Sequence, residues 1–435
     1  MMPGSVLVIG GGIAGIQAAL NLADKGIHTY IVERLPTIGG HMALLDKTFP
    51  TNDCSICILA PKLADCTNHP NIEVLAYSEV ESVEGGQGAF RVKVRRKARF
   101  VDEEKCTGCE ECVKSCPVRV ENEFNLGLNM RKAIYIPFPQ SVPRVATIDP
   151  KKCMHFTRGK CGVCKIKCQA GAVNYDEQDK MVELEVGSII AATGFEVFDP
   201  SELTEYGYGV HKDVVTSMEF ERILCASGPT GGKICRPSDS KTPDRIVFIQ
   251  CVGSRDPKHG RPYCSSVCCM HSIKEAMLVK EHDEHVETCI LYTDLRVAGK
   301  GFYEYAERGR KDYGIKYVRA KPGRILRDEA TGQLEIWYED TATKKVEKIT
   351  AGMAVLATNL MPRDGSRKLA EILGVELDEY GFFRSPDPLL RPVDTTKPGI
   401  FVTGYCEAPK DIPESVAQAG AAALRASKVV AGVTA

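Results

Sequence analysis

The sequence predicts an α/β protein with two Rossmann-like domains, one of which is interrupted by a small α+β segment. The chain opens with a short apolar run, SVLVIG, that leads directly into a glycine-rich turn. Two runs of four cysteines lie between residues 106 and 168, and a second apolar run, RIVFIQ, begins at residue 245. Short runs rich in β-branched residues are typical of buried parallel strands.

The composition indicates a globular protein of two or three domains. The 435 residues are 43% hydrophobic, and 56 basic residues balance 57 acidic ones, for a net charge of −1. This balance lacks the positive footprint that nucleic acid requires. Residues 1–23 carry no charge but are rich in glycine, which favours a nucleotide-binding turn over a membrane span. We expect no nucleic-acid partner, no membrane span and, without a signal peptide, a cytoplasmic location.

The first strand, turn and helix predict a dinucleotide site. Gly10, Gly12 and Gly15 have the spacing G-x-G-x-x-G, and helical periodicity follows over Ile16–Asp24. Gly10 permits the tight turn, Gly12 lets the backbone approach a pyrophosphate, and Gly15 lets the helix pack on the strand. The pyrophosphate would then lie at the N-terminus of the helix.

The residues after the second strand favour FAD over NAD. This strand covers His28–Val32 and ends at Glu33, the acid expected to accept the ribose hydroxyls. Arg34 follows as a further cofactor-binding candidate, and Gly39-Gly40 completes the flavoprotein pattern E-x-x-x-x-x-G-G.

Two later segments resemble parts of the same flavin domain. Residues 188–194 read SIIAATG, a strand that ends in an A-T-G turn, and residues 399–404 read GIFVTG, ahead of a helical run over Ser415–Leu424. Ordinary strand–turn–helix structure is the alternative for each segment alone. The candidate cofactor-binding residues in them are Thr193, Gly194, Gly404, Asp411 and Ile412.

Nineteen cysteines are the clearest chemical signal in the chain. Most of them cluster at two- and three-residue spacings, which suit metal clusters better than pairwise disulfides. The first run has the bacterial ferredoxin spacing C-x2-C-x2-C-x3-C-P, and the second has C-x7-C-x2-C-x3-C. We predict two [4Fe–4S] clusters in preference to a pair of zinc sites. In two-cluster ferredoxins the fourth cysteine of each run serves the other cluster. The predicted ligand sets are therefore Cys106, Cys109, Cys112 and Cys168 for one cluster, and Cys153, Cys161, Cys164 and Cys116 for the other.

The second Rossmann-like domain lacks the glycine fingerprint of an NAD(P)H site. Arg245–Gln250 predicts its first strand, and Ala354–Thr358 resembles the return of the chain to the flavin domain. Four cysteines stand where the glycines belong. We interpret them as ligands of a third [4Fe–4S] cluster, the alternative being buried apolar residues. They are Cys251, Cys264, Cys268 and Cys269.

The other cysteines leave several interpretations open. Cys54 and Cys57 suit a redox dithiol, a ligand pair for a cluster shared with another chain, or a structural role. We expect His41 and His155 to lie near the cofactors without ligating a cluster, and the solitary cysteines to be buried. The solitary cysteines are Cys66, Cys225, Cys235, Cys289 and Cys406.

The combination of motifs resembles the A subunit of heterodisulfide reductases, in a short form. It is carried by the ferredoxin-like insert and by the segments DCSICILAPK (53–62), QCVGSRD (250–256), YCSSVCC (263–269) and KDIPESVAQ (410–418). The resemblance implies a thioredoxin-reductase-like fold with an inserted ferredoxin domain. It also implies that the cysteines between residues 251 and 269 hold an extra cluster, and that Lys274 acts catalytically near the reactive nitrogen of the flavin.

The resemblance further implies an anaerobic oxidoreductase subunit that passes electrons between FAD and iron–sulfur clusters, in some members with flavin-based electron bifurcation. Expected partners are subunits like the B and C subunits of heterodisulfide reductase and an electron donor such as a hydrogenase or formate dehydrogenase, in a dimer of heteromers. Longer members carry additional N- and C-terminal cluster domains, so here a low-potential exit would need another subunit, or bifurcation would be absent. The alternatives are an NAD(P)H-dependent reductase, a disulfide reductase that uses Cys54 and Cys57, and a non-catalytic scaffold.

These interpretations divide the chain into five parts. They are the first part of the FAD domain (1–100), the inserted 2[4Fe–4S] ferredoxin domain (101–180), the FAD-domain return and linker (181–240), the second Rossmann-like domain (241–360) and the last part of the FAD domain (361–435).

Overall fold

The computed structural model describes residues 4–432, so the outermost ends of the predicted FAD domain, 1–3 and 433–435, lie outside the described residues. The chain forms two compact units. The five-part division made from the sequence stays a prediction. Unit 1 consists of Met1–Ala43, Ile58–Phe195 and Pro362–Ala435, and unit 2 consists of Leu44–Cys57 and Glu196–Met361.

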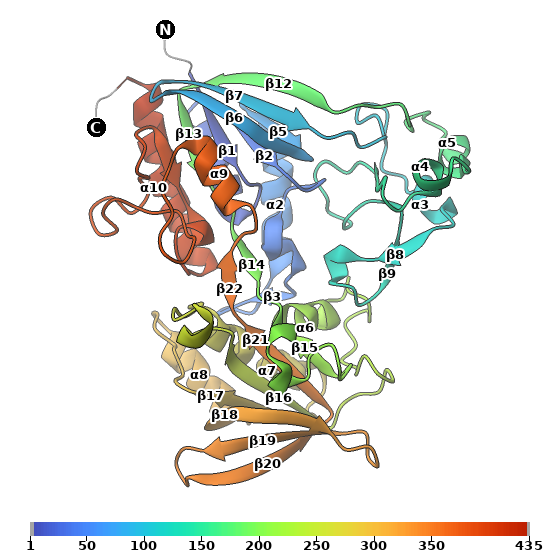
Figure 1. Ribbon diagram of the computed structural model, residues 1–435, viewed down its shortest axis with the longest axis vertical. Helices are drawn as coiled ribbons and strands as arrows, with labels where there is room; N and C mark the ends of the chain where they lie inside the picture. The colour runs from blue at the N-terminus through green and yellow to red at the C-terminus, as the bar shows by residue number, and fades with distance from the viewer. Residues whose placement is uncertain (1–3, 433–435) are drawn as a thin grey trace. The chain divides into compact units, whose positions relative to one another are not determined.

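A five-stranded parallel sheet forms the core of unit 1, in the order β23-β13-β1-β2-β5 (Figure 1). The order brings strands from the beginning, the middle and the end of the chain side by side. These strands are short and rich in β-branched residues, as the sequence predicts, and β1, β13 and β23 are fully buried. The strands are β1 (Ser5–Ile9), β2 (His28–Glu33), β5 (Ile72–Ala76), β13 (Ser188–Ala191) and β23 (Ile400–Val402).

Helices and a second sheet bury the parallel sheet. Helices α1 and α10 pack against each other and against strands of the sheet. An antiparallel sheet, in the order β12-β7-β6, shares a core with it, in which Phe90 and Val92 meet Leu7 and Ile9. The elements are α1 (Ile13–Ala23), β6 (Ser78–Gly86), β7 (Ala89–Arg96), β12 (Lys180–Val186), α9 (Ser366–Leu373) and α10 (Ile412–Val430).

The cysteine-rich insert leaves unit 1 between two strands that pair with each other. Arg96 ends β7 and lies opposite Lys180, the first residue of β12, so 83 residues can be inserted without breaking the sheet. The short elements of the insert lie together in Figure 1, around a core that includes four cysteines. They are α3 (Glu111–Ser115), β8 (Arg119–Glu121), η2 (Glu123–Asn125), β9 (Met130–Lys132), β10 (Ile134–Tyr135), β11 (Thr147–Ile148), α4 (Met154–Arg158) and α5 (Val163–Lys167).

Unit 2 is built on a seven-stranded sheet in the order β15-β21-β16-β17-β18-β19-β20. The first five strands are parallel and the last two form an antiparallel meander. Two segments differ from expectation: part of the predicted linker forms β15 and α6, and the predicted return strand is an interior strand here, β21. The strands are β15 (Val214–Thr216), β16 (Arg245–Val252), β17 (Glu287–Tyr292), β18 (Lys316–Arg327), β19 (Leu334–Asp340), β20 (Lys345–Ala351) and β21 (Met353–Thr358).

Three helices accompany this sheet, and short elements complete the chain. No helix among residues 4–432 has the length and apolar character that crossing a membrane requires. The helices of unit 2 are α6 (Ser217–Leu224), α7 (Cys268–His282) and α8 (Phe302–Lys311). The remaining elements are η1 (Gly40–Leu44), β3 (Lys47–Thr48), β4 (Asp53–Cys54), α2 (Ser55–Asn68), β14 (Phe195–Val197), η3 (Pro200–Glu202), η4 (Thr204–Tyr206), η5 (Pro257–His259), β22 (Leu360–Pro362) and η6 (Gly404–Cys406).

Candidate cofactor sites

The turn between β1 and α1 has the backbone geometry of a phosphate-binding loop. Gly10 has φ +111°, and a Cβ there would lie 2.3 Å from the carbonyl oxygen of Ala192. A Cβ on Gly15 would lie 2.0 Å from the carbonyl oxygen of Gly10, so side chains are excluded at both positions. Gly12 is the N-cap of α1, no side chain caps it, and its Cβ position has open space around it. An anion can therefore reach the first N–H groups of this helix.

Glu33 and the Gly39-Gly40 pair hold this loop in place. The Glu33 carboxylate accepts hydrogen bonds from the backbone N–H groups of Gly11 and Leu35, both at 2.8 Å. Each of its oxygens keeps lone pairs for a further donor. The N–H of Gly39 donates to the carbonyl of Gly11 at 2.7 Å. A Cβ on Gly40 would lie 2.9 Å from the Cα of Gly12, which explains the second glycine of the pattern.

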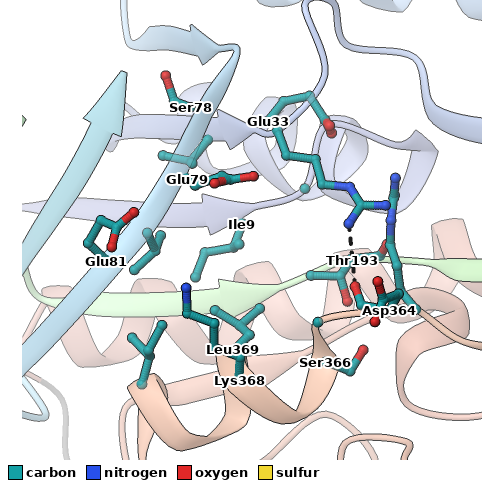
Figure 2. Close-up of a pocket in the computed structure, with 17 residues that line it drawn as sticks. Ile9, Glu33, Ser78, Glu79, Glu81, Thr193, Asp364, Ser366, Lys368 and Leu369 are labelled. Atoms are coloured by element: carbon teal, nitrogen blue, oxygen red, sulfur yellow. Dashed lines mark hydrogen bonds between the residues drawn. The ribbon is translucent and has the colours of Figure 1, made fainter. Parts of the chain in front are cut away.

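A pocket of about 200 Å³ opens beside Glu33, between strands β1, β2 and β6 and helix α9 (Figure 2). It is lined by four predicted residues: Gly10, Glu33, Arg34 and Thr193. The volume far exceeds the roughly 10–15 Å³ that a single water occupies. The residues present therefore fit part of a dinucleotide.

Several polar residues of this pocket were not predicted from the sequence. Arg363 donates to the carbonyl oxygen of Thr193 at 3.4 Å, and Arg34 donates to the carbonyl oxygen of Asp364 at 3.3 Å. These contacts join segments more than 150 residues apart, and no motif marks the C-terminal partner. The additional polar lining residues are Ser78, Glu79, Glu81, Arg363, Asp364, Ser366 and Lys368.

The C-terminal flavin candidates lie close to the same loop. Gly404 has φ +75°, and a Cβ there would lie 2.8 Å from the Cβ of Ala14 in α1. Asp411 is the N-cap of α10 and accepts a hydrogen bond from the N–H of Glu414 at 2.8 Å. Ile412 is the first residue of that helix. Gly194, with φ +72°, follows Thr193 at the end of β13. Unit 1 thus assembles the predicted dinucleotide residues from three distant segments.

The insert groups its cysteines across the two runs. One internal cavity is lined by Cys116 of the first run and by Cys153, Cys161 and Cys164 of the second. The pKa of the Cys112 thiol is raised to about 12, mainly by burial and further by the nearby thiols of Cys106, Cys164 and Cys168. Cys116 thus lies with the second run, while Cys112 has neighbours from both predicted sets, Cys106 and Cys168 of its own and Cys164 of the other, so the crossed ligand sets stay a prediction. Cys109 is exposed.

The cysteine sulfurs are spaced too widely for single zinc ions. Tetrahedral Zn–S bonds of about 2.3 Å place neighbouring sulfurs roughly 3.8 Å apart. Among residues 4–432, no three cysteine sulfurs lie within 4.8 Å of one another. A larger four-iron cluster, which spreads its four thiolates further apart, fits these sets better.

The four cysteines of unit 2 converge at the N-terminus of α7. Cys268 and Cys269 begin this helix, and their thiols lie near those of Cys251 and Cys264. Cys251 is the next-to-last residue of β16 and has φ +60°. Burial raises the pKa of the Cys269 thiol to about 11, so a thiolate here requires a metal or another positive charge.

A buried hydrogen-bond network holds the two ends of the loop that carries Cys251 and Cys264. The Ser265 hydroxyl donates to Oδ1 of Asn359 at 2.6 Å, and the Ser254 hydroxyl lies 2.7 Å from that of Ser265. Serines and asparagines in loops give no sequence signal for such a role. The loop replaces the direct strand-to-helix turn of a dinucleotide site, in agreement with the missing second glycine fingerprint.

Lys274 lies in helix α7 of unit 2, and its side chain is buried rather than exposed to solvent. It is 1% exposed and forms an ion pair with Glu221, which is fully buried. His271 Nε2 lies 3.1 Å from a Glu221 oxygen and 3.2 Å from one of Glu275. Burial raises the pKa of Glu221, but the positive charges of Lys274 and His271 outweigh it and lower that pKa overall. The flavin contact expected for Lys274 stays a prediction.

The remaining candidates from the sequence, two cysteines and two histidines, each form contacts within their own unit. Cys54 and Cys57 form a disulfide, with their Cα atoms 5.3 Å apart. His155 Nδ1 lies 2.9 Å from the carbonyl oxygen of Cys161. His41 stacks on Phe195 at 4.1 Å, and burial, with Arg363 and Arg34, lowers its pKa to about 3.

The expectation that the solitary cysteines are buried is confirmed for four of them. It is wrong for Cys235, which is half-buried because it lies in an irregular surface loop. The buried ones are Cys66, Cys225, Cys289 and Cys406.

Comparison with known proteins gives a consistent result. Residues 5–48 match the family described as FAD dependent oxidoreductase, and residues 99–120 match the 4Fe-4S binding domain. The chain is 52% identical over 425 residues to an iron–sulfur A subunit of the CoB–CoM heterodisulfide reductase of Methanopyrus kandleri. It is 49% identical over 421 residues to the A subunit of the H2:CoB–CoM heterodisulfide, ferredoxin reductase of Methanothermobacter thermautotrophicus.

These relatives are longer than the chain. The alignments cover 98% and 97% of it but only 64% and 63% of the relatives. Among solved structures, the thioredoxin reductase of Lactococcus lactis is similar, with a TM-score of 0.53 and 18% identity. That match covers 98% of this chain and 99% of the reductase, and it bears on the fold alone.

Proposed function

Because this chain belongs to the family of heterodisulfide reductase A subunits, we propose that it is an electron-transfer subunit of such a complex, with FAD and three [4Fe–4S] clusters. FAD supplies the exchange between two-electron and one-electron steps, and the clusters conduct single electrons. The observation that carries the proposal is that unit 1 contains both the glycine loop held by Glu33 and a cavity in which a first-run cysteine meets three second-run cysteines.

The residues of unit 1 support the binding of FAD. The open N-terminus of α1 at Gly12 would hold the pyrophosphate, and Glu33 would accept the ribose hydroxyls. Arg363 and Lys368 would add positive charge beside the phosphates and exclude water from the pocket. Lys274, which pairs with Glu221 in unit 2, would act near the reactive nitrogen of the flavin, as the resemblance implies.

Twelve cysteines would hold the three clusters. Two of the clusters would lie in the insert and the third in unit 2. Backbone N–H groups already point at the sulfurs of the third set. The N–H of Arg296 donates to Cys269 Sγ at 3.4 Å, and that of Ser266 donates to Cys264 Sγ at 3.3 Å. Such bonds stabilise thiolate charge and raise the potential of a cluster. As in the relatives' names, proteins that handle hydrogen or formate, ferredoxin and a heterodisulfide would be the partners.

The first test is an anaerobic determination of iron, sulfide and FAD on the purified chain. We expect about one FAD and about twelve irons per chain. About eight irons would remove the third cluster from the proposal, and the absence of iron would remove all three.

A Gly12→Ala variant tests the flavin site separately. The added Cβ meets no protein atom within 4 Å, so we expect an unchanged melting temperature. The methyl group would occupy the path of the pyrophosphate, so FAD affinity should fall at least about tenfold, a loss of about 1.4 kcal/mol. Gly86→Ala, also in open space in unit 1, is the matched control. Full FAD occupancy in Gly12→Ala would contradict the assignment of this loop.

The Cys54–Cys57 disulfide supports a second candidate function, reduction of a disulfide substrate by this pair. Cys57 lies in the first turn of α2, where the positive end of the helix stabilises a thiolate. If the pair is catalytic, Cys57→Ser should abolish dithiol-dependent reduction of a small disulfide and leave the iron content unchanged. Unchanged turnover would exclude the disulfide-reductase function and leave electron transfer as the remaining proposal.

A further inference from the structure

We propose that the face of the insert that carries the second cysteine run is a docking surface for an acidic electron-transfer protein. This inference rests on the proposed function, because it requires a cluster at that run. Between residues 150 and 175 the sequence has six Lys and Arg residues and no Asp or Glu. We call these six exposed side chains the basic face. They are Lys151, Lys152, Arg158, Lys160, Lys165 and Lys167.

The charge of the basic face is only partly balanced within the chain, where Lys167 lies within electrostatic range of Glu111 and Lys152 within that of Glu123. In the part of the chain that the structure describes, none of its six side chains forms an ion pair. The acidic residues beside the first cysteine run, by contrast, mostly form ion pairs with basic residues. The two halves of the insert therefore differ in the amount of charge that is left without an ion pair. The pairs are Asp102 with Lys105 at 2.9 Å, Glu110 with Arg144 at 3.1 Å and Glu111 with Lys114 at 2.8 Å.

The basic face belongs to the same short segment as the second cysteine run. Four of its lysines are immediate sequence neighbours of second-run cysteines. Three of these cysteines line the internal cavity with Cys116, so the positive charge begins within one residue of the proposed ligands. The adjacent pairs are Lys152 with Cys153, Lys160 with Cys161, Lys165 with Cys164, and Lys167 with Cys168.

An exposed apolar side chain lies within the basic face. Ile166 is 82% exposed on α5, between Lys165 and Lys167 and two residues after Cys164. A single exposed isoleucine is unremarkable by itself. Surrounded by unpaired lysines, it forms the small apolar centre and charged rim of a transient interface. Weak electron-transfer encounters use interfaces of this modest size.

These features indicate the chemistry of the partner. Unpaired positive charge steers an acidic protein toward the face and accelerates encounter up to several hundredfold at low salt. A polyanion such as DNA would use the same charge, but it would gain nothing from an apolar residue beside a cluster. The occupant that uses all three features is an acidic protein with its own exposed redox centre.

The test compares the wild type and three variants of the cluster-loaded chain, with an acidic 2[4Fe–4S] ferredoxin as the probe. Lys165→Glu/Lys167→Glu reverses two charges of the basic face. Lys344→Glu/Lys345→Glu, on exposed residues at the β19–β20 turn, makes the same change in net charge elsewhere. Dissociation constants are measured by anaerobic calorimetry at low and high salt, after the iron content of each form is determined.

We expect binding of the ferredoxin to weaken at least about tenfold in Lys165→Glu/Lys167→Glu at low salt, and less at high salt. The control variant should stay within about twofold of the wild type. Ile166→Ser should weaken binding equally at both salt concentrations, because its contribution is not electrostatic. Equal weakening in the control, or tighter binding of a DNA duplex than of ferredoxin to the basic face, would overturn the docking proposal. A wild-type chain without insert iron would instead contradict the proposed function.

Discussion

A Cys116→Ala variant is expected to lose the cluster of the second cysteine run, although Cys116 belongs to the first. The thiol of Cys116 lines the cavity that Cys153, Cys161 and Cys164 enclose. Removal of one of four thiolates exposes the cluster to solvent and loss. The iron content should therefore fall by about four per chain.

Double variants identify which cluster is lost. Cys116→Ala/Cys153→Ala should lose no more iron than either single variant, because both residues serve one cluster. Cys106→Ala/Cys116→Ala should lose about eight irons, although these two residues lie in the same run. Cys235→Ala, a half-buried cysteine outside all predicted sets, is the control and should keep its full iron content. The reverse pattern between the two double variants would show that each run serves its own cluster.

A Lys274→Met variant is expected to lower the free energy of unfolding by about 3–5 kcal/mol at neutral pH. Methionine fills a similar volume, but it removes one of the two cations that compensate the fully buried Glu221 carboxylate and leaves only His271 beside it. Denaturant unfolding of the variant measures the loss. Lys311→Met on α8, an exposed lysine, is the control and should change the free energy by less than about 0.5 kcal/mol.

Two further results distinguish this ion pair from simple packing. The double variant Glu221→Gln/Lys274→Met should recover much of the lost stability, because it leaves no unpaired charge. The pH dependence should change as well. The pKa of Glu221 is lowered by Lys274 and His271 against the effect of burial. Its contribution is therefore complete above its usual pKa of 4.5 and is lost as the pH falls toward the folded value. Lys274→Met should flatten this acid limb, and an unchanged limb would contradict the role given to the pair.

The local chemistry of the cofactor sites could be predicted from the sequence because its signals are local. The spacing of Gly10, Gly12 and Gly15 expresses backbone constraints within one turn, and the structure shows the close contacts that enforce them. The crossed grouping of the cysteines is a prediction from a known spacing, and Cys116 lines one cavity with three cysteines of the second run. The insert is marked by a rise in cysteine content between β7 and β12, two strands that pair with each other.

The parts that escaped prediction depend on contacts between distant segments. Arg363 reaches Thr193 across 170 residues, and the Ser265–Asn359 bond spans 94. Nothing in the local sequence marks either contact. The segment 181–240 reads as a return to the FAD domain and a linker, yet β15 and α6 within it join the sheet of unit 2 through β21. The position of Lys274 in its helix does not reveal its burial, because that burial depends on Glu221 from another helix.

The position of β23 in the parallel sheet has a consequence for biosynthesis. Its neighbour β13 is made more than 200 residues earlier, and α10 packs beside α1 from the very beginning of the chain. On the ribosome, the nucleotide-binding unit therefore stays incomplete until β23 and α10 have emerged, while the insert closes its own sheet connection much earlier. We expect nascent chains halted after the insert to be able to take up iron before any can retain flavin. Cofactor loading would then follow the order of translation.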